Sequence, residues 1–540
     1  MGGSRPSRVR LGSARLALAV ATILVLALLL LLVGAPTHDG PSKAAVRTRR
    51  IEPAKDAPRP VRGSSAGATG GVLGLARAAV TVSPGADAIK IPSSFLGVST
   101  EYWSLPLLER HMAALQQVLS LLHVPGSGPL VLRIGGDSAD HSFWDPKLGK
   151  APRWVFRLTP KWLAQTSALV RGLRAKVILD LNLVTGSPLE AVEWARVAQK
   201  GLPRGSLTGF EIGNEPDLYD RSFWRATTAR RWLGAAPVPL NMSSRGYARD
   251  FVAYGRLLTQ VASTVPLVAP AIGHPGLDDN WISTLLAEPH PGLRIVSAHW
   301  YPYSGCVPRS SPSYPTIGRL LGGSAARMAR RLRPIVRRVH RGGLRFRLTE
   351  LNSVTCGGLR GVSDTFATAL WAPDALFELA RAGVDGVNVH IRVHTINAPF
   401  ALTARGVRAR PFLYGLILFA RTLGPDPQIV NARLHASRSL RLKVWAVRAL
   451  GDTLHVLLID KGTRSVRVYL HLPARGPATV ERLLAPSVRS VDAVTLDGQR
   501  LGSDGRWQGS PAHETISLTG HAYQLTVPQL SAALVVVHLR

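Results

Sequence analysis

Two glutamates stand at the ends of predicted buried strands, and their residue type and spacing suit the cleavage of a glycosidic bond. Glu215 closes the predicted fourth strand within the segment 209–216, GFEIGNEP, and Glu350 lies in the segment 345–352, RFRLTELN. Two carboxyl groups about 5–5.5 Å apart can cleave such a bond with retention of configuration, one protonating the leaving oxygen while the other attacks the anomeric carbon. The acid must stay protonated near neutral pH and the nucleophile must stay ionised. We therefore predict that Glu215 and Glu350 are catalytic.

The sequence around Glu215 is more informative than a single acidic residue would be. A lone glutamate at a strand end more often forms a surface salt bridge. Here Asn214, Glu215 and Pro216 follow one another. Pro216 prevents the strand from continuing and fixes the turn. The amide of Asn214 can donate to a sugar hydroxyl beside the acid.

Between residues 93 and 424, short apolar segments alternate with segments of helical period, and these elements must position the two glutamates. Eight buried strands alternating with helices predict an α/β fold, a (β/α)8 TIM barrel whose function collects at the C-terminal strand ends. Strands four and seven face each other across the barrel mouth, so Glu215 and Glu350 can approach. An open doubly wound sheet is the alternative, but no glycine-rich phosphate loop follows the first strand. The predicted strands are 95–100, 130–134, 176–183, 207–213, 265–272, 294–300, 345–351 and 386–393, and the predicted helices include 162–173, 189–200, 247–263 and 325–340.

After about residue 425 the helical pattern stops. The remaining segments alternate or are rich in β-branched residues, and turns such as Asp497-Gly498 and Asp504-Gly505 separate them. This pattern predicts a C-terminal β-sandwich domain over residues 425–540. Residues 79–92 are predicted to be N-terminal strands that join the same sandwich. The predicted sandwich strands are 440–449, 453–460, 465–472, 479–484 and 531–539.

The N-terminus predicts export. Arginines precede an apolar run over 16–35, and about 20 such residues can cross a bilayer as a helix, whereas a cleaved signal has an apolar core of roughly 7–15. Pro36 disfavours cleavage after the small residues 33–35. Residues 1–35 are therefore predicted to be a membrane-spanning signal anchor, a cleaved signal peptide being the alternative, with the body of the protein at the extracellular face of the membrane or secreted. Residues 36–78, rich in Pro, Gly, Ser, Ala and Arg, are predicted to be a flexible linker.

The charge of the chain is strongly positive. Among 540 residues, 66 are Lys or Arg and 33 are Asp or Glu, which gives a formal net charge of +33. Such a balance suits an anionic partner, which can be nucleic acid, an acidic membrane surface or an acidic polysaccharide. The basic residues are scattered and do not interleave with aromatic residues, so nucleic-acid binding is not predicted. The basic stretch 327–341 is predicted to be the solvated face of a helix, contact with an anionic polymer or lipid being the alternative.

Several motifs resemble one known family. They are FLGVSTEYW (95–103), LRIGGDSADHSFW (132–144), GFEIGNEPDLY (209–219), SAHWYPYSGC (297–306) and the block 347–390 after Glu350. Over about residues 79–540 the chain resembles glycoside hydrolase family 79, the heparanase and β-glucuronidase group. The resemblance implies a retaining β-glycosidase that hydrolyses β-glucuronides. It also implies that Glu215 is the acid/base, Glu350 the nucleophile and Asn214 the residue that binds the sugar's 2-hydroxyl.

Four further residues are predicted to bind substrate. Glu101 ends the first strand and Asp137 follows the second, where the family's pattern implies hydrogen bonds to sugar hydroxyls; capping of the next helix is the alternative. His299 and Tyr301 alternate on the sixth strand and share a face. We expect Tyr301 to hydrogen-bond the Glu350 carboxylate, although a lone His or Tyr on a strand is more often packed in a core.

A uronic acid requires recognition of its own carboxylate, and the sequence leaves this open. Arg392, His394 and Asn397 follow the eighth strand, and Arg360 lies in the loop after Glu350. Each can supply charge or hydrogen bonds.

The chain has two cysteines, Cys306 and Cys356, and they follow strands six and seven. In an exported protein two such cysteines are predicted to form a disulfide, which would fix the rim loops beside Glu350. The alternative is two free thiols that lie too far apart to be joined.

Two other functions remain alternatives. The same barrel and mechanism could act on a neutral xyloside, arabinofuranoside or galactoside. A non-catalytic carbohydrate-binding envelope protein is the second alternative, but a binding module does not require a nucleophile. No zinc, flavin or nucleotide motif is found in the sequence, so no metal or cofactor is predicted.

Overall fold

The computed structural model describes residues 75–145 except 84 and 86, then 151–222, 224, 227 and 242–539. The predicted signal anchor, 1–35, lies outside these residues, as does the predicted linker up to residue 74. Among the residues that the structure describes, no helix has both the length and the apolar character needed to cross a membrane. The described residues all belong to one unit of the chain, Leu73–Arg540.

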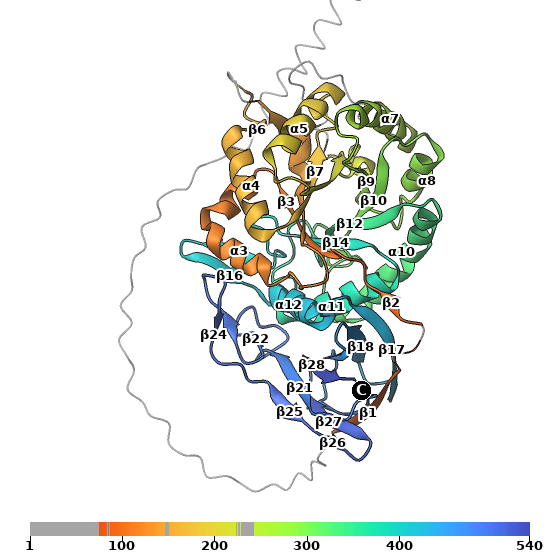
Figure 1. The fold of residues 1–540 in the computed structure, drawn as a ribbon, viewed down its shortest axis with the longest axis vertical. Coiled ribbons are helices and arrows are strands. Elements are labelled where there is room, and N and C mark those ends of the chain that lie inside the picture. Colours follow the sequence, from red (N-terminus) through yellow and green to blue (C-terminus); the bar gives the residue numbers. More distant parts are fainter. Residues whose placement is uncertain are drawn as a thin grey trace, which may run out of the picture. The chain divides into compact units, whose positions relative to one another are not determined.

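Eight parallel strands of the described chain close into a barrel (Figure 1), which confirms the predicted TIM barrel. The cyclic order is β10-β12-β14-β3-β4-β7-β8-β9, so strands adjacent in sequence are adjacent in the barrel. Each predicted strand overlaps one observed strand. The strands are β3 (Leu96–Glu101), β4 (Val131–Gly135), β7 (Lys176–Leu181), β8 (Leu207–Ile212), β9 (Leu267–Ile272), β10 (Leu293–Trp300), β12 (Arg345–Leu351) and β14 (Gly386–His390).

Helices follow the strands and form the outer layer of the barrel. The starts of four are fixed by side-chain caps: Thr316 caps the short helix Ile317–Leu321, and Thr159, Ser187 and Ser243 cap three longer helices, each by accepting a hydrogen bond from a backbone N–H in the first turn. Those three are α4 (Pro160–Leu173), α5 (Pro188–Gly201) and α7 (Ser244–Val261). The other helices are α2 (Leu105–Leu108), α3 (Met112–Ser120), α8 (Asn280–Ala287), α9 (Ile317–Leu321), α10 (Ser324–Arg341), α11 (Phe366–Arg381) and α12 (Pro411–Leu423).

The helices α11 and α12, which follow the seventh and eighth strands, are not among the helices predicted by residue range. Residues 366–380 of α11 are all buried, and so is nearly all of α12. A helix that is covered on every side lacks the polar face that marks an amphipathic helix in sequence. Figure 1 shows both helices on the border between the barrel and the C-terminal sheet, where they are covered from both directions.

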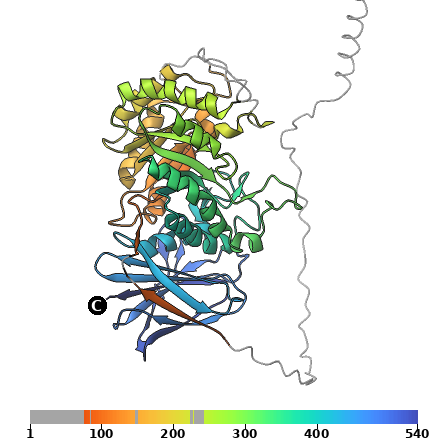
Figure 2. The same cartoon turned by 90° about the vertical axis from the view of Figure 1, so that its right-hand side faces the viewer.

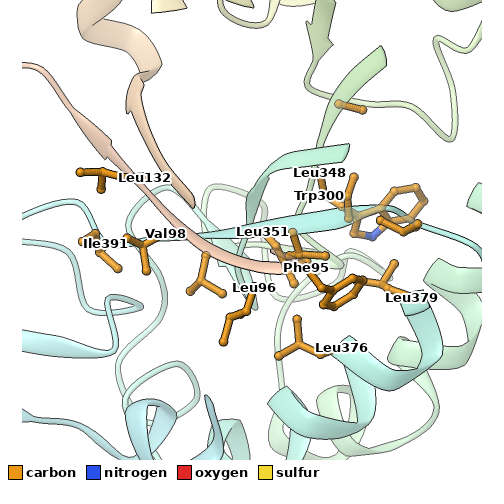
Figure 3. Packing of buried hydrophobic residues seen from close by; sticks show 14 of the residues in the cluster. Phe95, Leu96, Val98, Leu132, Trp300, Leu348, Leu351, Leu376, Leu379 and Ile391 are labelled. Carbon is orange, nitrogen blue, oxygen red and sulfur yellow. The ribbon is translucent and has the colours of Figure 1, made fainter. Parts of the chain in front are cut away.

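The apolar core of the barrel extends into these two helices. One cluster of buried side chains includes Phe95, Leu348 and Leu351 of the barrel together with Leu376 and Leu379 of α11. Figure 3 shows part of this cluster. The barrel and the helices beneath it therefore share one core.

The predicted β-sandwich is a single curled sheet of twelve strands within the described residues (Figure 2). Its order is β22-β21-β28-β19-β18-β17-β1-β20-β27-β26, with β2 beside β17 and β25 beside β21. The strand β17 joins the two halves, because residues 428–430 pair with β18 and residues 431–436 pair with β1. The strands are β1 (Ala76–Ser83), β2 (Ile89–Lys90), β17 (Gln428–Ala436), β18 (Leu442–Ala449), β19 (Thr453–Asp460), β20 (Val466–His471), β21 (Ala478–Leu484), β22 (Thr495–Leu496), β25 (Glu514–Ile516), β26 (Leu518–Thr519), β27 (Ala522–Val527) and β28 (Ser531–His538).

The predicted end of the linker at residue 78 is wrong. The strand β1 begins at Ala76, pairs with β17 and β20, and buries Ala78, Val80 and Val82 in the core of the sheet. Small alanines at the start of the strand carry little hydrophobic signal, so residues 76–78 resembled linker in sequence. The strands β1 and β2 both pair with β17, so the N-terminal segment is part of the C-terminal sheet.

Candidate active site

Glu215 and Glu350 come from opposite sides of the barrel and meet at its mouth. Glu350 lies on β12, and Glu215 follows β8 in a left-handed conformation with φ of 50°. The backbone N–H of Glu215 donates to the carbonyl of Ala271 at 3.0 Å, which holds this strained turn in place. One carboxylate oxygen of each glutamate and one ring nitrogen of His299 all lie within 4.8 Å of one another.

The carboxylate of Glu350 is surrounded by cations and donors. Its Oε1 accepts a hydrogen bond from Nη1 of Arg133 at 2.8 Å, and its Oε2 accepts one from the Tyr301 hydroxyl at 2.7 Å. The Nδ1 of His390 lies 3.2 Å from the same Oε2. Burial by itself would raise the pKa of Glu350, but the charges of His390, His299 and Arg133 outweigh it and hold the pKa well below its ordinary value.

Glu215 has the opposite tendency. Its Oε1 lies 3.0 Å from Nδ1 of His299. Burial raises the pKa of Glu215; His299 offsets this effect only in part, and the negative charge of Glu350 adds to it. The pKa values of these two neighbouring carboxyl groups are thus shifted in opposite directions, which favours the protonated form of Glu215 and the ionised form of Glu350.

The two histidines of the site favour their charged forms. Burial would lower their pKa values, but the negative charge of Glu350 raises the pKa of both His299 and His390. The Nε2 atoms of both rings are buried and have no hydrogen-bond partner in the part of the chain that the structure describes. Each ring therefore holds its Nδ1 edge against a carboxylate, and Nε2 of His390 lies 3.8 Å from Oε1 of Glu101.

The other sequence-predicted residues lie around the same mouth. Glu101 ends β3, and its Oε2 accepts the backbone N–H of Ser138 at 2.8 Å, while its buried Oε1 has no partner among the described residues. Asp137 is half exposed and lies 3.3 Å from Nη1 of Arg392. Nδ2 of Asn214 donates to Asp137 at 3.4 Å. Glu101 does not cap the helix that follows it, because Ser138 lies in the turn after β4. The Oε1 of Glu101 lies 3.8 Å from both Nε2 of His390 and Nη1 of Arg392.

The residue that sequence reasoning missed is Arg133. Its side chain is fully buried on β4, and besides Glu350 it contacts Glu211 at 2.7 Å, Asp180 at 2.9 Å and Oδ1 of Asn214 at 3.0 Å. One guanidinium group therefore orients both Asn214 and Glu350. The signal that could have found it is an arginine inside an otherwise apolar predicted strand. His390 was also missed, and it could have been found in the same way, as a polar residue inside the predicted eighth strand.

The structure separates the four candidates for binding a uronate. Arg392 reaches the site, because Nη1 lies 3.8 Å from Glu101 and its guanidinium group stacks over Trp103 at 5.5 Å. Asn397 is buried and its amide donates to the carbonyl of Val354. His394 and Arg360 are exposed.

A hollow of about 460 Å³ lies beside Arg392, and neither Glu215 nor Glu350 is part of its lining. Asp137 and Arg392 form part of its wall, and aromatic side chains form much of the rest. Aromatic faces pack against the apolar faces of sugar rings, while charged groups orient them. The aromatic residues of the wall are Trp103, Trp154, Phe156 and Trp224.

A disulfide joins Cys306 to Cys356, with 6.0 Å between the Cα atoms. The two cysteines follow a short parallel pair, β11 (Tyr303–Ser304) and β13 (Val354–Thr355), in the loops after β10 and β12. The disulfide therefore ties together the two rim loops that follow the strands of His299 and Glu350.

Among the residues that the structure describes, two groups of three side chains have the spacing of metal ligands. Glu215, His299 and Glu350 form one, in which Nδ1 of His299 already lies at hydrogen-bond distance, 3.0 Å, from Oε1 of Glu215. The other group includes Asp217, whose two oxygens accept the backbone N–H groups of Gly273 and His274. The Asp217 carboxylate is therefore already used to hold the backbone of the segment 273–274.

Comparison with known proteins points to enzymes that cleave glycosidic bonds. No family model matches this chain. A β-glucuronidase of Aspergillus niger is 22% identical over 508 residues, which cover 84% of this chain and 92% of the relative. A 4-O-α-L-rhamnosyl-β-D-glucuronidase of Fusarium oxysporum has a TM-score of 0.67 at 18% identity, covering 85% of this chain and 99% of that one. A GH51 arabinofuranosidase of Xanthomonas axonopodis pv. citri has a TM-score of 0.63 at 14% identity, covering 86% and 100%.

The two kinds of comparison carry different weight. The solved structures share the barrel with its C-terminal β domain and, at such low identity, show the fold alone. The sequence match spans most of both chains. The chain is therefore homologous, at low identity, to a glycoside hydrolase.

Proposed function

We propose that this protein is a retaining β-glycosidase of glycoside hydrolase family 79 that hydrolyses β-glucuronides. The observation that supports it most strongly is the carboxylate pair. Glu215 and Glu350 approach within 4.8 Å at the mouth of the barrel, and their pKa values are shifted in opposite directions. This spacing fits an attacking carboxylate better than it fits an intervening water, which needs carboxyl groups roughly 6.5–9.5 Å apart.

In the first step Glu350 attacks the anomeric carbon, and Glu215 gives its proton to the oxygen of the leaving group as the glycosidic bond breaks. The product is a sugar bonded covalently to Oε1 or Oε2 of Glu350. In the second step Glu215, now ionised, takes a proton from water, whose oxygen attacks the same carbon and releases Glu350. Arg133 and Tyr301 hold the nucleophile, each through one carboxylate oxygen.

Glucuronides are favoured over neutral glycosides because of the charges around the site. Arg392 lines the hollow, and both Arg392 and His390, whose pKa is raised chiefly by the charge of Glu350, lie 3.8 Å from Glu101, where they can pair with a sugar carboxylate. The Aspergillus relative is named for that activity. Neutral arabinofuranosides are the second candidate, since arabinofuranosidases share the fold.

A panel of aryl glycosides tests the substrate. Turnover of p-nitrophenyl β-D-glucuronide should exceed turnover of the β-xyloside, the β-galactoside and the α-L-arabinofuranoside. The variant Arg392→Gln should raise KM for the glucuronide and leave any neutral substrate unaffected. Preference for a neutral glycoside would overturn the glucuronide assignment, and binding without turnover across the panel would favour a non-catalytic protein.

The role of Glu215 has its own test. Glu215→Ala should still form the glycosyl-enzyme from substrates with good leaving groups, and added azide should speed its turnover by replacing water as the second nucleophile. A trapped intermediate in mass spectrometry would support the role. Absence of both azide rescue and intermediate would contradict it.

We further propose that the enzyme is exported and held at the outer face of a membrane by residues 1–35. The support is the run 16–35, which is apolar apart from Thr22 and Gly34, and the proline that follows it. Cell fractionation with N-terminal sequencing tests this proposal. A soluble extracellular protein that begins near residue 36 would show that the run is a cleaved signal.

A further inference from the structure

A second hollow, of about 650 Å³, lies on the border between the barrel and the C-terminal sheet. One wall is the hairpin of β15 (Phe400–Thr403) and β16 (Gly406–Ala409), and the other is the sheet-domain loop 491–503. Figure 1 shows the place by its label for β16. We call this feature the junction hollow; the hydrolysis described above does not use it.

The floor of the junction hollow is apolar and fixed. Val407 and Val494 are buried, and Tyr414 of α12 lies beneath them. The two walls are joined by hydrogen bonds, because the Tyr414 hydroxyl accepts the N–H of Leu501 at 2.9 Å and the N–H of Val407 donates to the carbonyl of Ser503 at 2.8 Å. The hollow is therefore formed before any ligand arrives.

The rim of the junction hollow is positively charged. Arg405 and Arg408 come from the hairpin and Arg500 comes from the sheet domain, and all three are exposed. Asp492 is the acidic residue of the lining. Within the described residues, no side-chain hydrogen bond or ion pair is made by any of the three guanidinium groups. Three cations from two segments that remain unpaired around one concavity are suited to an anionic ligand.

Positive charge extends from the junction hollow toward the catalytic glutamates. Arg410 follows the hairpin, and its Nη1 donates to three carbonyls of the segment 395–398, in the loop after β14. After burial, the charges of Arg408 and Arg360 are among the causes that lower the pKa of Arg410, so both lie within electrostatic reach of it. Arg360 lies in the loop that follows Glu350.

From these observations we infer that the junction hollow is a secondary binding site for a carboxylate- or sulfate-bearing segment of a polysaccharide. The inference rests on the proposed function only for the identity of the polymer. Guanidinium groups form charge-assisted, bidentate hydrogen bonds with such anions, and the apolar floor packs against sugar rings. A polymer held there stays at high local concentration near the barrel mouth.

The arginines of α10 are the competing surface. Arg330, Arg337 and Arg341 are equally exposed, and no ion pair involves them in the described part of the chain. They lie on one outer helix face, whose opposite side is packed in the core. The hollow beside them, of about 740 Å³, is lined by α10 alone, and its one apolar lining residue, Pro334, is exposed. This surface therefore offers charge without a second wall or a buried apolar floor, so we expect it to bind polyanions weakly and without regard to their chemistry.

The experiment compares the binding of one anionic glycan to the junction hollow and to the arginine face of α10. The full chain in the Glu350→Gln background, which does not cleave its ligand, would be titrated calorimetrically with a heparin-derived octasaccharide. The variant Arg405→Gln/Arg408→Gln/Arg500→Gln should bind at least about tenfold more weakly, since each lost pairing weakens binding. The matched control Arg330→Gln/Arg337→Gln/Arg341→Gln, with the same change in net charge, should bind within about twofold of the parent. Thermal unfolding would verify that both variants fold.

Inorganic polyphosphate of matched charge separates a glycan site from a general polyanion site. It should bind more weakly than the octasaccharide, because it has no apolar ring faces for the floor. Equal binding of the two probes, or equal losses in the two triple variants, would overturn the inference. Because the measurement is of binding, absence of glycoside hydrolysis together with intact octasaccharide binding would overturn the proposed function and leave the secondary site standing.

Discussion

Two regions of the protein bury charged side chains, and the regions differ in how completely those charges are paired. Between α11 and the C-terminal sheet, Nζ of Lys461 lies 2.5 Å from Oδ2 of Asp374, and the indole of Trp445 donates to Oδ1 at 3.0 Å. Lys443 pairs with Glu378 at 2.5 Å. Burial would raise the pKa of Asp374, but Lys461 and Lys443 outweigh it and lower the pKa. Charge in this cluster is balanced.

At the barrel mouth, several buried carboxylate oxygens have no hydrogen-bond donor in the part of the chain that the structure describes. Glu101, Asp180 and Glu211 each keep one buried oxygen without a hydrogen-bond partner among the described residues. Burial raises the pKa of Glu101 and, more strongly, that of Asp180. Asp180 and Glu211 share one cation, Arg133, and a buried carboxylate oxygen that lacks a hydrogen bond costs free energy.

The difference between the α11 cluster and the barrel mouth indicates that side chains at the mouth were selected for function at a cost in stability. The cluster at α11 closes every polar atom of Asp374, as a structural contact should. The mouth leaves several buried donors and acceptors without hydrogen-bond partners among the described residues, and groups with strongly shifted pKa values concentrate there. Substitutions in the mouth should therefore affect rate, and substitutions in the α11 cluster should affect folding.

The largest expected effect is on the rate at the mouth. Glu350→Gln should reduce hydrolysis by roughly 10⁴-fold or more, because an amide cannot attack the anomeric carbon. Its unfolding free energy should change by only about 1–2 kcal/mol, since Arg133 keeps Glu211 and Asp180. Initial rates and chemical denaturation measure the two quantities. Retained activity would contradict the role of Glu350, and global unfolding would contradict the comparison.

The next effect is on stability at the α11 cluster. Lys461→Met should destabilise the protein by about 3–5 kcal/mol, because it leaves Asp374 buried without its nearest cation. The double variant Asp374→Leu/Lys461→Met should recover most of that loss, and kcat/KM of the folded protein should be unaffected in both. Denaturant titration and initial rates measure these outcomes.

The Lys461→Met effect should also depend on pH in one direction. The pKa of Asp374 is lowered in the folded state from its ordinary 3.8, so its stabilising contribution is present above that value and is lost as the pH falls through the folded pKa. The difference in stability between wild type and Lys461→Met should be full at neutral pH and disappear in strong acid. A constant difference would show that lost packing, and not lost charge, is the cause.

The pH profile of the mouth provides a third test. The rate should fall at low pH as Glu350 is protonated and at high pH as Glu215 is ionised. The charge of His299 lowers the pKa of both glutamates. His299→Gln should therefore move both limbs of the kcat/KM profile to higher pH. The control is His340→Gln: His340 lies on α10 and pairs with Asp385, so its loss should leave both limbs in place.

The smallest effect is expected at the disulfide. Cys306→Ser/Cys356→Ser should lower activity by about threefold to tenfold, because the bond fixes rim loops beside Glu350. The melting temperature should change less than in Lys461→Met. A non-reducing peptide map of the exported protein should contain one linked pair; two alkylated thiols without prior reduction would show that the bond does not form.

Local pattern alone predicted a large part of the molecule. Each barrel strand is a short apolar run, so its position was readable from neighbouring residues. The same was true of Glu215 and Glu350, because a carboxylate just past a buried strand of such a barrel must lie at the mouth. The β-rich C-terminal region was also predicted, but its two halves form one curled sheet through the pairing of β17 with both β18 and β1.

The tertiary structure decided what depends on distant residues. Arg133 and Glu350 are 217 positions apart and share a hydrogen bond, and Lys461 reaches Asp374 across 87. No local period encodes such pairs, because both partners are charged residues that sequence patterns place at the surface. The sequence by itself determined which groups could do chemistry; the closed barrel determined which of them carry a proton, because burial and neighbouring charge set each pKa.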